Sequence, residues 1–211
     1  MVSGGLGRVT AAPSSLDKTQ TLTSSYFVND RIRSQAVGSS TMTWSLDPTL
    51  RVAAVSSTVG TTTVAKQNHY SSDGDSPSWI SEDTANPNLI TRYVPGMDGQ
   101  LAVQSTSKTA LTSRSLQLVD MHGDVMAVLP ITDGASSTTV MTGLQARATD
   151  EFGMPLDLTS GGVSANAPPR YGWLGGPQRS GETLGGTILM GVRVYHPATG
   201  RFLSTDPVPG G

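Results

Sequence analysis

Short stretches in which apolar and polar residues alternate, separated by turn residues, recur along most of this chain. The clearest are Tyr26–Ser34, Met42–Val55, Ile90–Val103 and Leu116–Leu129, and each has turn residues near its middle. Alternation with period two predicts strands with one buried face, and an internal turn predicts a β-hairpin. We therefore expect four hairpins, with one further strand at Thr61–Tyr70.

The residues at the centre of each hairpin support this prediction. They are Asn29-Asp30, Asp47-Pro48, Asp98-Gly99 and His122-Gly123-Asp124. Asn, Asp and Gly tolerate the positive φ that tight turns require, and Asp-Gly is a strong hairpin signal. Proline cannot donate to a central ladder, so Pro48 belongs in a turn.

A hairpin alone is only marginally stable, so successive hairpins must pair edge to edge. The predicted fold class is therefore all-β, with successive β-hairpins forming an elongated curved sheet or a partial β-shell. The composition agrees, because the chain has 24 Gly and 13 Pro, is rich in Ser and Thr, and lacks long windows of helix-forming residues.

Four regions follow from the pattern. Residues 1–23 are polar and predict a loop or a ragged first strand. Residues 24–156 hold the degenerate hairpin repeats, and residues 157–169 form a linker rich in Gly, Ser and Pro. Residues 170–211 form an aromatic, glycine-rich C-terminal module.

Charge and cysteine content exclude several classes of function. The formal net charge is −2 and there are no runs of basic residues, so nucleic acid is not an expected partner. The chain has no cysteine, which excludes disulfides, thiolate metal sites and a cysteine nucleophile. The N-terminus lacks the pattern of a signal peptide, and no segment is apolar enough to span a membrane.

The candidates for metal or catalytic chemistry are weak. The histidines His69, His122 and His196 are far apart in sequence, and each is expected to be solvated at a turn or strand end. Asp73-Gly-Asp75 with Glu82-Asp83 does not fit the spacing of a calcium loop. We predict no catalytic residue, no cofactor-binding residue, no metal site and no cofactor.

Two other groups of side chains have alternative interpretations. The rings of Trp79, Tyr93, Tyr171 and Trp173 could stack on sugars, but packing over the sheet is favoured. The arginines that follow turns, Arg31, Arg51 and Arg201, are expected to bridge carbonyls or carboxylates of a neighbouring repeat. The alternative is that these arginines are exposed charges of little consequence.

The chain resembles the Rhs/YD-repeat family at two places. Tyr26-Phe-Val-Asn-Asp-Arg-Ile resembles the YD repeat Tyr-Asp-x-x-Gly-Arg-Leu, with Phe27 in place of Asp and Asp30 in place of Gly. The stretch from Tyr171-Gly-Trp-Leu-Gly-Gly through His196-Pro-Ala-Thr-Gly-Arg-Phe-Leu-Ser-Thr-Asp-Pro207 resembles the Rhs repeat-associated core domain.

That resemblance implies a β-sheet wound into a hollow shell around a C-terminal toxin. In the family the core motif continues to a second Asp-Pro cluster, where aspartates perform autoproteolysis before a variable toxin domain. The 211 residues hold no counterpart of that cluster or of the toxin, so Asp206 is not expected to be catalytic. The resemblance also implies a secreted or cell-surface location.

Three hypotheses about function follow. The first is a non-enzymatic wall segment of an Rhs/YD-repeat toxin or surface protein, whose partners are the rest of the shell or a toxin domain in a parent protein. The second is a glycan-binding surface module. The third is the remnant of a self-cleaving core. The exposed edges of an open sheet additionally predict edge-to-edge self-association.

Overall fold

The computed structural model of the 211-residue chain describes residues 1–4, 7–109, 111–132, 134, 140, 142–159 and 169–206. It is an all-β protein with one antiparallel sheet of thirteen strands and a second sheet of three strands. The predicted fold class is therefore confirmed. The described residues contain no α-helix, and no helix among them is long and apolar enough to cross a membrane.

The large sheet is a meander in which each strand pairs with the next strand in the chain. Its strands are β1 Val2–Ser3, β2 Val9–Pro13, β3 Thr21–Tyr26, β4 Ile32–Val37, β5 Ser40–Leu46, β6 Val52–Val59, β7 Thr62–His69, β8 Trp79–Ser81, β9 Ile90–Pro95, β10 Leu101–Lys108, β11 Leu111–Val119, β12 Val125–Ile131 and β13 Gln145–Ala146. The small sheet holds β14 Ile188–Met190, β15 Arg193–His196 and β16 Arg201–Phe202, with a 3-10 turn at Pro197–Thr199.

One rim of the large sheet is built from a five-residue turn that recurs with nearly constant geometry. The amide of its first residue bonds to the carbonyl of its fifth at 2.7–3.0 Å, and its fourth amide bonds to its first carbonyl at 2.8–3.2 Å. The fourth residue has a φ between 64° and 96°. These rim turns are 27–31, 47–51, 96–100, 120–124 and 150–154. The geometry is that of a type I turn followed by a left-handed residue that forms a bulge.

Aspartate at the first position stabilises three of these five turns, 47–51, 120–124 and 150–154. The Oδ1 atom of Asp47 accepts hydrogen bonds from the amides of Thr49 and Arg51, both at 2.9 Å. Asp120 and Asp150 do the same in their own turns. One carboxylate thus satisfies amides that the ladder leaves unpaired, as in other turns that begin with Asp.

On the opposite rim, three of the hairpins close with two-residue turns, whereas the β2–β3 and β8–β9 connections are longer loops. Gly38 and Gly60 occupy the first position of two of these turns, with φ of 56° and 60°. Thr109 takes the same conformation in a third, with φ of 56°. Two-residue turns with positive φ match the twist of the flanking strands. The hairpins β3–β4, β5–β6, β9–β10 and β11–β12 thus turn at the rim of five-residue turns, and three of the connections at the other rim are tight turns.

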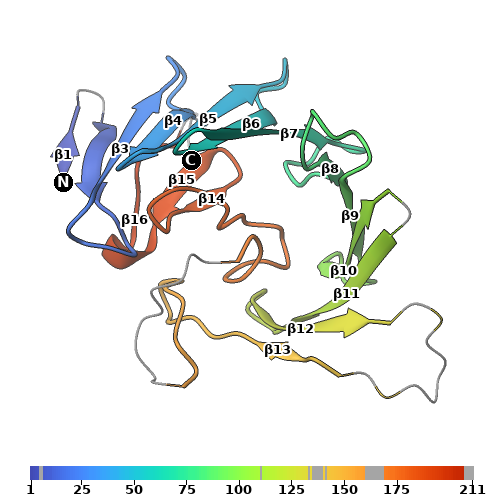
Figure 1. The fold of residues 1–211 in the computed structure, drawn as a ribbon. Coiled ribbons are helices and arrows are strands. Elements are labelled where there is room, and N and C mark those ends of the chain that lie inside the picture. Colours follow the sequence, from blue (N-terminus) through green and yellow to red (C-terminus); the bar gives the residue numbers. More distant parts are fainter. Residues whose placement is uncertain are drawn as a thin grey trace.

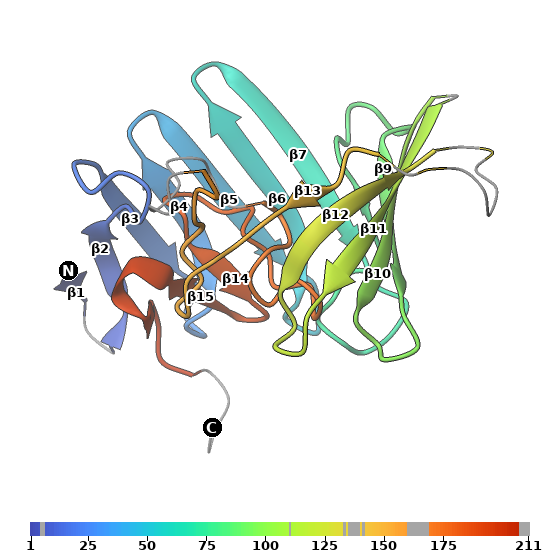
Figure 2. The ribbon, with the colours of Figure 1, turned by 90° about the horizontal axis from the view of Figure 1, so that it is seen from below.

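The large sheet bends into an open arc, and the C-terminal segment 169–206 lies inside it (Figure 1). In Figure 2, which views the arc from below, the small sheet lies in front of β3–β6. The hairpins of β9–β12 form the opposite side of the arc. Two apolar clusters join the C-terminal segment to the sheet. The first contains Leu22, Ile32, Met42, Trp44, Val52, Val194 and Leu203, and the second contains Ile80, Tyr93, Leu101, Val125, Val128 and Tyr171.

The C-terminal segment also bonds to the sheet through its backbone. The amide of Val9 donates to the carbonyl of Leu203 at 2.7 Å, and that of Val125 donates to Gly172 at 2.8 Å. The hydroxyl of Tyr26 donates to the carbonyl of Leu203 at 2.9 Å. The segment therefore connects the first strands of the arc to the last ones, across its concave side.

The four predicted hairpins and the strand at 61–70 are confirmed as β3–β4, β5–β6, β9–β10, β11–β12 and β7. The sequence pattern predicted no strand between residues 71 and 88, but this stretch contains β8, in which Trp79 and Ile80 continue the sheet. Most of the expected linker, residues 160–168, lies outside the described residues. The expected division into four regions stays a prediction.

Candidate functional site

A cavity of about 950 Å³ lies between the inner face of β5–β10 and the C-terminal segment. Its apolar wall comes from both sides and includes Trp44, Val55, Val64, Leu184 and Leu189. The sheet also contributes polar side chains to the lining, among them those of Ser57, Thr91, Gln104 and Thr106. The inner face of the arc thus carries both apolar and hydroxyl-bearing side chains.

A network of four charged side chains forms one part of the cavity wall. The guanidinium of Arg170 donates two hydrogen bonds to Glu82, at 2.6 and 2.7 Å, and one to Glu182 at 2.7 Å. The ammonium of Lys66 lies 3.2 Å from Glu82 and also bonds to Glu182. A further hydrogen bond of 2.6 Å joins Arg170 to the hydroxyl of Tyr93. Two cations and two anions cancel, so the network is neutral.

The network controls the protonation of its members. Burial opposes ionisation of Glu82, but the hydrogen bonds and the charge of Arg170 lower its pKa to about 2. The pKa of Glu182 is also lowered, against the effect of burial, by Arg170 and Lys66. Burial alone would lower the pKa of Arg170, but Glu82 and the other network members raise it instead. Glu82, Glu182 and Arg170 therefore stay charged at neutral pH.

This network joins elements that are distant in sequence. Lys66 lies on β7, Glu82 directly follows β8, and both Arg170 and Glu182 belong to the C-terminal segment. The exposed fractions of the Glu82 and Arg170 side chains are 11% and 17%. A paired and partly buried network of this kind is costly to break at one member, because the remaining charge loses its partner. Its role is to fix the C-terminal segment on the sheet.

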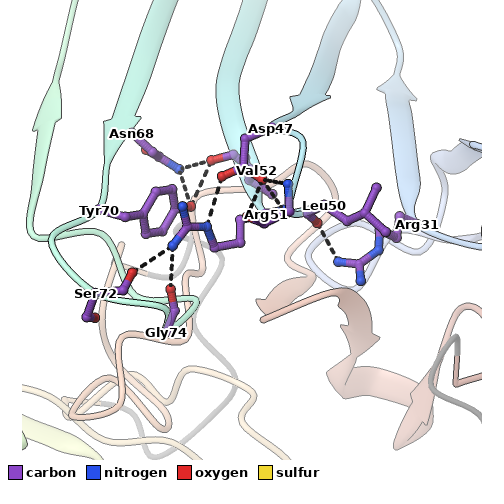
Figure 3. Close-up of polar contacts among 10 residues, drawn as sticks. Arg31, Asp47, Leu50, Arg51, Val52, Asn68, Tyr70, Ser72 and Gly74 are labelled. Atoms are coloured by element: carbon purple, nitrogen blue, oxygen red, sulfur yellow. Dashed lines mark hydrogen bonds and ion pairs between the residues drawn. The ribbon is translucent and has the colours of Figure 1, made fainter.

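Arginines at the fifth turn position connect neighbouring turns along the rim. Figure 3 shows Arg51, which bonds to Asp47 at 2.9 Å and donates to the carbonyl of Ser72 in the next loop at 2.7 Å. Its guanidinium lies over the ring of Tyr70, 4.2 Å from the centroid. Asn68 and Tyr70 in turn bond to the carbonyl of Val52 at 3.0 and 2.8 Å.

Arginines also connect one turn to the next earlier in the chain. Arg31 donates to the carbonyl of Leu50 in the following turn, and Arg8 donates to that of Val28 at 2.8 Å and pairs with Asp30. The expected bridging role is confirmed for Arg31 and Arg51. Arg201 differs, because its side chain is exposed and its guanidinium makes no hydrogen bond or ion pair with another described residue.

The three histidines lie in different environments. His196 was expected to be solvated, but this prediction is wrong, because only 1% of its surface is exposed. Its Nε2 lies 2.8 Å from the carbonyl of Pro13 and its Nδ1 lies 3.1 Å from the hydroxyl of Thr199. His69 stacks on Trp79 with ring centroids 3.4 Å apart. His122 is exposed, as expected for a turn residue.

The acidic candidates are occupied by ion pairs. Asp75 bonds to Arg179 at 2.7 Å, and Glu82 belongs to the network with Arg170. Asp206 lies 3.2 Å from Arg193. Across the part of the chain that the structure describes, no group of three or more His, Asp or Glu side chains is placed to hold a metal ion.

The aromatic candidates for sugar stacking lie mostly within the core. Tyr93 and Tyr171 are buried and meet edge to face, with centroids 5.3 Å apart. The ring of Trp173 is covered on one side by Tyr195, at 5.1 Å. On Gly153, in the last rim turn, an added Cβ would come within 2.7 Å of the same indole.

Sequence reasoning missed two features. It did not single out Lys66, Arg170 or Glu182, because no local pattern marks charges that meet only in the folded chain. It also missed a contact near the N-terminus, where the amide of Gly4 bonds to the carbonyl of Arg8 at 2.8 Å and Gly7 has a φ of 72°. The signal for that contact was the Gly-Arg-aliphatic sequence at residues 7–9.

Comparisons with known proteins give limited information. No family model matches the chain, and no curated protein matches it. Among solved structures, "Crystal Structure of TcdB2-TccC3-Cdc42" is 12% identical with a TM-score of 0.30, covering 89% of this chain and 16% of that chain. A Photorhabdus luminescens Tc holotoxin pore carrying a TccC3 mutation is 13% identical with a TM-score of 0.36, covering 90% and 14%. The chain thus spans less than a fifth of either matched chain, and TM-scores this low support no argument about its fold or function.

Proposed function

We propose that this chain is a non-enzymatic wall segment of an Rhs/YD-repeat shell. Its partners would be the rest of the shell or a toxin domain within a longer, exported parent protein. The observation that supports the proposal is the rim of repeated five-residue turns, in which arginines bond to the following turn. These arginines make contacts between neighbouring turns of the wall.

The arc gives the chain two faces with different surroundings. An inner surface enclosed by the C-terminal segment is what a wall needs, because a wall separates an interior from solvent. The charged side chains of the inner surface are paired with one another, which supports a structural role over catalysis. A general acid or base would instead need a perturbed group held near a substrate.

Single cysteines can test whether the arc has an interior, since the chain has no cysteine of its own. Ser57 lines the cavity, whereas its neighbour Ser56 lies on the outer face, paired with Thr43 and Ala65. Both serines are half-buried. We expect Ser57→Cys to react with a small maleimide but slowly with a maleimide on a large polyethylene glycol. Ser56→Cys is the matched control and should react with both reagents. Equal rates for the two variants with the bulky reagent would refute an enclosed inner face.

Two further measurements separate this function from its alternatives. A glycan-binding module would show saturable binding on a glycan array, whereas a wall segment should show none. Mass spectrometry tests the hypothesis of a self-cleaving remnant, because the intact chain has a mass of 21.9 kDa that a wall segment keeps during storage. Fragments ending near Asp206 would contradict the proposal.

A further inference from the structure

The outer face of the large sheet changes character along the arc. In β4–β7 the outward row is Ser34, Thr43, Ser56 and Ala65, each directly opposite the next across the ladder. In β9–β12 the corresponding outward row is Val94, Val103, Leu116 and Leu129. Residues directly opposite each other share one face of a sheet. The second row is outward because Tyr93, next to Val94, is buried in the inner core.

This outer face of β9–β12 is apolar and exposed. Val94 is 50% exposed, and Leu118, two residues beyond Leu116, is 41% exposed. The other members of the row, Val103, Leu116 and Leu129, are half-buried. Contiguous exposed apolar patches on soluble proteins usually mark interaction sites. We define this surface as the outer apolar face.

The two ends of the outer apolar face carry charges of opposite sign. Toward the tight turns lie the exposed Arg92 and Arg114, both level with Ser105 on β10. Toward the other rim lie Asp98 and Asp120, in the turns 96–100 and 120–124. Arg114 and Asp120 are six residues apart, so each lies about 10 Å along the strand from the midpoint between them.

We propose that the outer apolar face is an interface between two copies of this chain. Two such faces can stack about 10 Å apart, as sheets in a sandwich do. A two-fold axis in the interface, perpendicular to the strands and level with that midpoint, reverses the strand direction. It places Arg114 over Asp120 of the second copy, and Arg92 over Asp98 of the second copy. Leu116 then faces Leu118 of the second copy.

The alternative two-fold axis, parallel to the strands, is disfavoured by charge. It would place the arginine end of one copy over the arginine end of the other, and like charges that face each other across an interface are unfavourable. The face is four strands wide, about 19 Å at the usual spacing. With a length of about 20 Å between its charged ends, the face covers roughly 400 Å² on each copy, about half of a standard interface, so we expect a weak dimer with a Kd of order 0.1 mM.

Sedimentation equilibrium of the full chain between about 10 μM and 1 mM tests the proposal, over the range around that Kd. The wild type should show a monomer–dimer equilibrium that weakens with added salt, since Arg92, Asp98 and Arg114 are exposed to the screening ions. Leu116→Asp should weaken the dimer by roughly tenfold or more, because it places a carboxylate in the apolar contact. Thr43→Asp, on the Ser/Thr-rich outer row, is the matched control and should leave the equilibrium unchanged.

Conservative variants test the charge pairing separately. Asp98→Asn and Asp120→Asn keep the oxygen that accepts the turn amides but remove the charge, so both should weaken the dimer while the melting temperature changes little. A wild type that stays monomeric at 1 mM would overturn the proposal. So would a dimer that persists in Leu116→Asp, because that result would assign association to the edges of the sheet.

Discussion

The charged network provides the sharpest test of how the C-terminal segment is held. In Glu82→Gln the side chain keeps its shape but loses its charge, so Arg170 and Lys66 share the single carboxylate of Glu182. The network then carries a net positive charge beside the cavity. Breaking one member of a buried ion pair costs about 3–5 kcal/mol. Because the glutamine oxygen still accepts a hydrogen bond from Arg170, we expect the low end of that range, about 3 kcal/mol.

For a chain of this size, each kcal/mol corresponds to about 2–4 °C in melting temperature, so the expected decrease is about 6–12 °C. Circular dichroism during thermal and urea unfolding at pH 7 measures it. The control is Asp75→Asn, which breaks the more exposed pair with Arg179 and should cost at most about 1 kcal/mol. Glu82→Gln combined with Lys66→Met restores neutrality and should be more stable than the sum of the two single changes predicts.

The pH dependence of this effect follows from the lowered pKa of Glu82. Its folded value is about 2, below the value of 4.5 for an ordinary glutamate. The ionised carboxylate therefore stabilises the fold fully above pH 4.5, and this contribution is lost as the pH falls through about 2. The difference in stability between wild type and Glu82→Gln should narrow from pH 5 to pH 2.5. A pH-independent difference, or a cost below about 1 kcal/mol at pH 7, would refute the reasoning that the charges are buried and mutually dependent.

The remaining predictions concern the turns and the buried histidine. Leu50→Gly should raise the free energy of unfolding by about 1 kcal/mol, seen as a higher urea midpoint. Leu50 has a strained φ of 68° that glycine adopts freely, and at 41% exposed its side chain gives little packing to lose. Gly99→Ala should lower stability by about 1 kcal/mol through backbone strain alone, since its added Cβ meets open space. Gly153→Ala should cost more than Gly99→Ala in the same assay, because its Cβ collides with Trp173; equal costs would exclude the collision. His196→Leu should lower the melting temperature by removing the donor of a buried carbonyl, at about 1–3 kcal/mol, and an unchanged value would contradict that hydrogen bond.

The hairpins could be predicted because their signals are local. Asp47 sits at the first position of its turn and bonds to amides two and four residues later, so the information lies within five residues. The same holds for the pairing of each strand with its neighbour in the chain. The left-handed Leu50 is the exception, since leucine gives no sign of positive φ. There the hydrogen bonds of Asp47 and Arg51 impose a conformation that the residue itself disfavours.

The candidate site could not be predicted because its members meet only after folding. Lys66 and Glu182 are separated by 116 residues, and Arg170 and Glu82 by 88. His196 was mispredicted for the same reason, since the Pro13 carbonyl that covers it lies 183 residues away. A sequence pattern records the neighbours of a residue along the strand. It does not record which distant segment will cover the inner face.

The position of the C-terminal segment inside the arc has a consequence for synthesis on the ribosome. Hairpins emerge first and can pair as they emerge, because each strand bonds to the one before it. Their inner side chains, including those of Leu22, Ile32 and Trp44, remain without cover until residues 169–206 have left the exit tunnel. A nascent chain therefore passes through a stage in which a partly formed sheet exposes its apolar inner face, because the C-terminal segment does not yet cover it. Chaperones that bind exposed apolar strands should engage this chain during translation and release it when residues 169–206 dock.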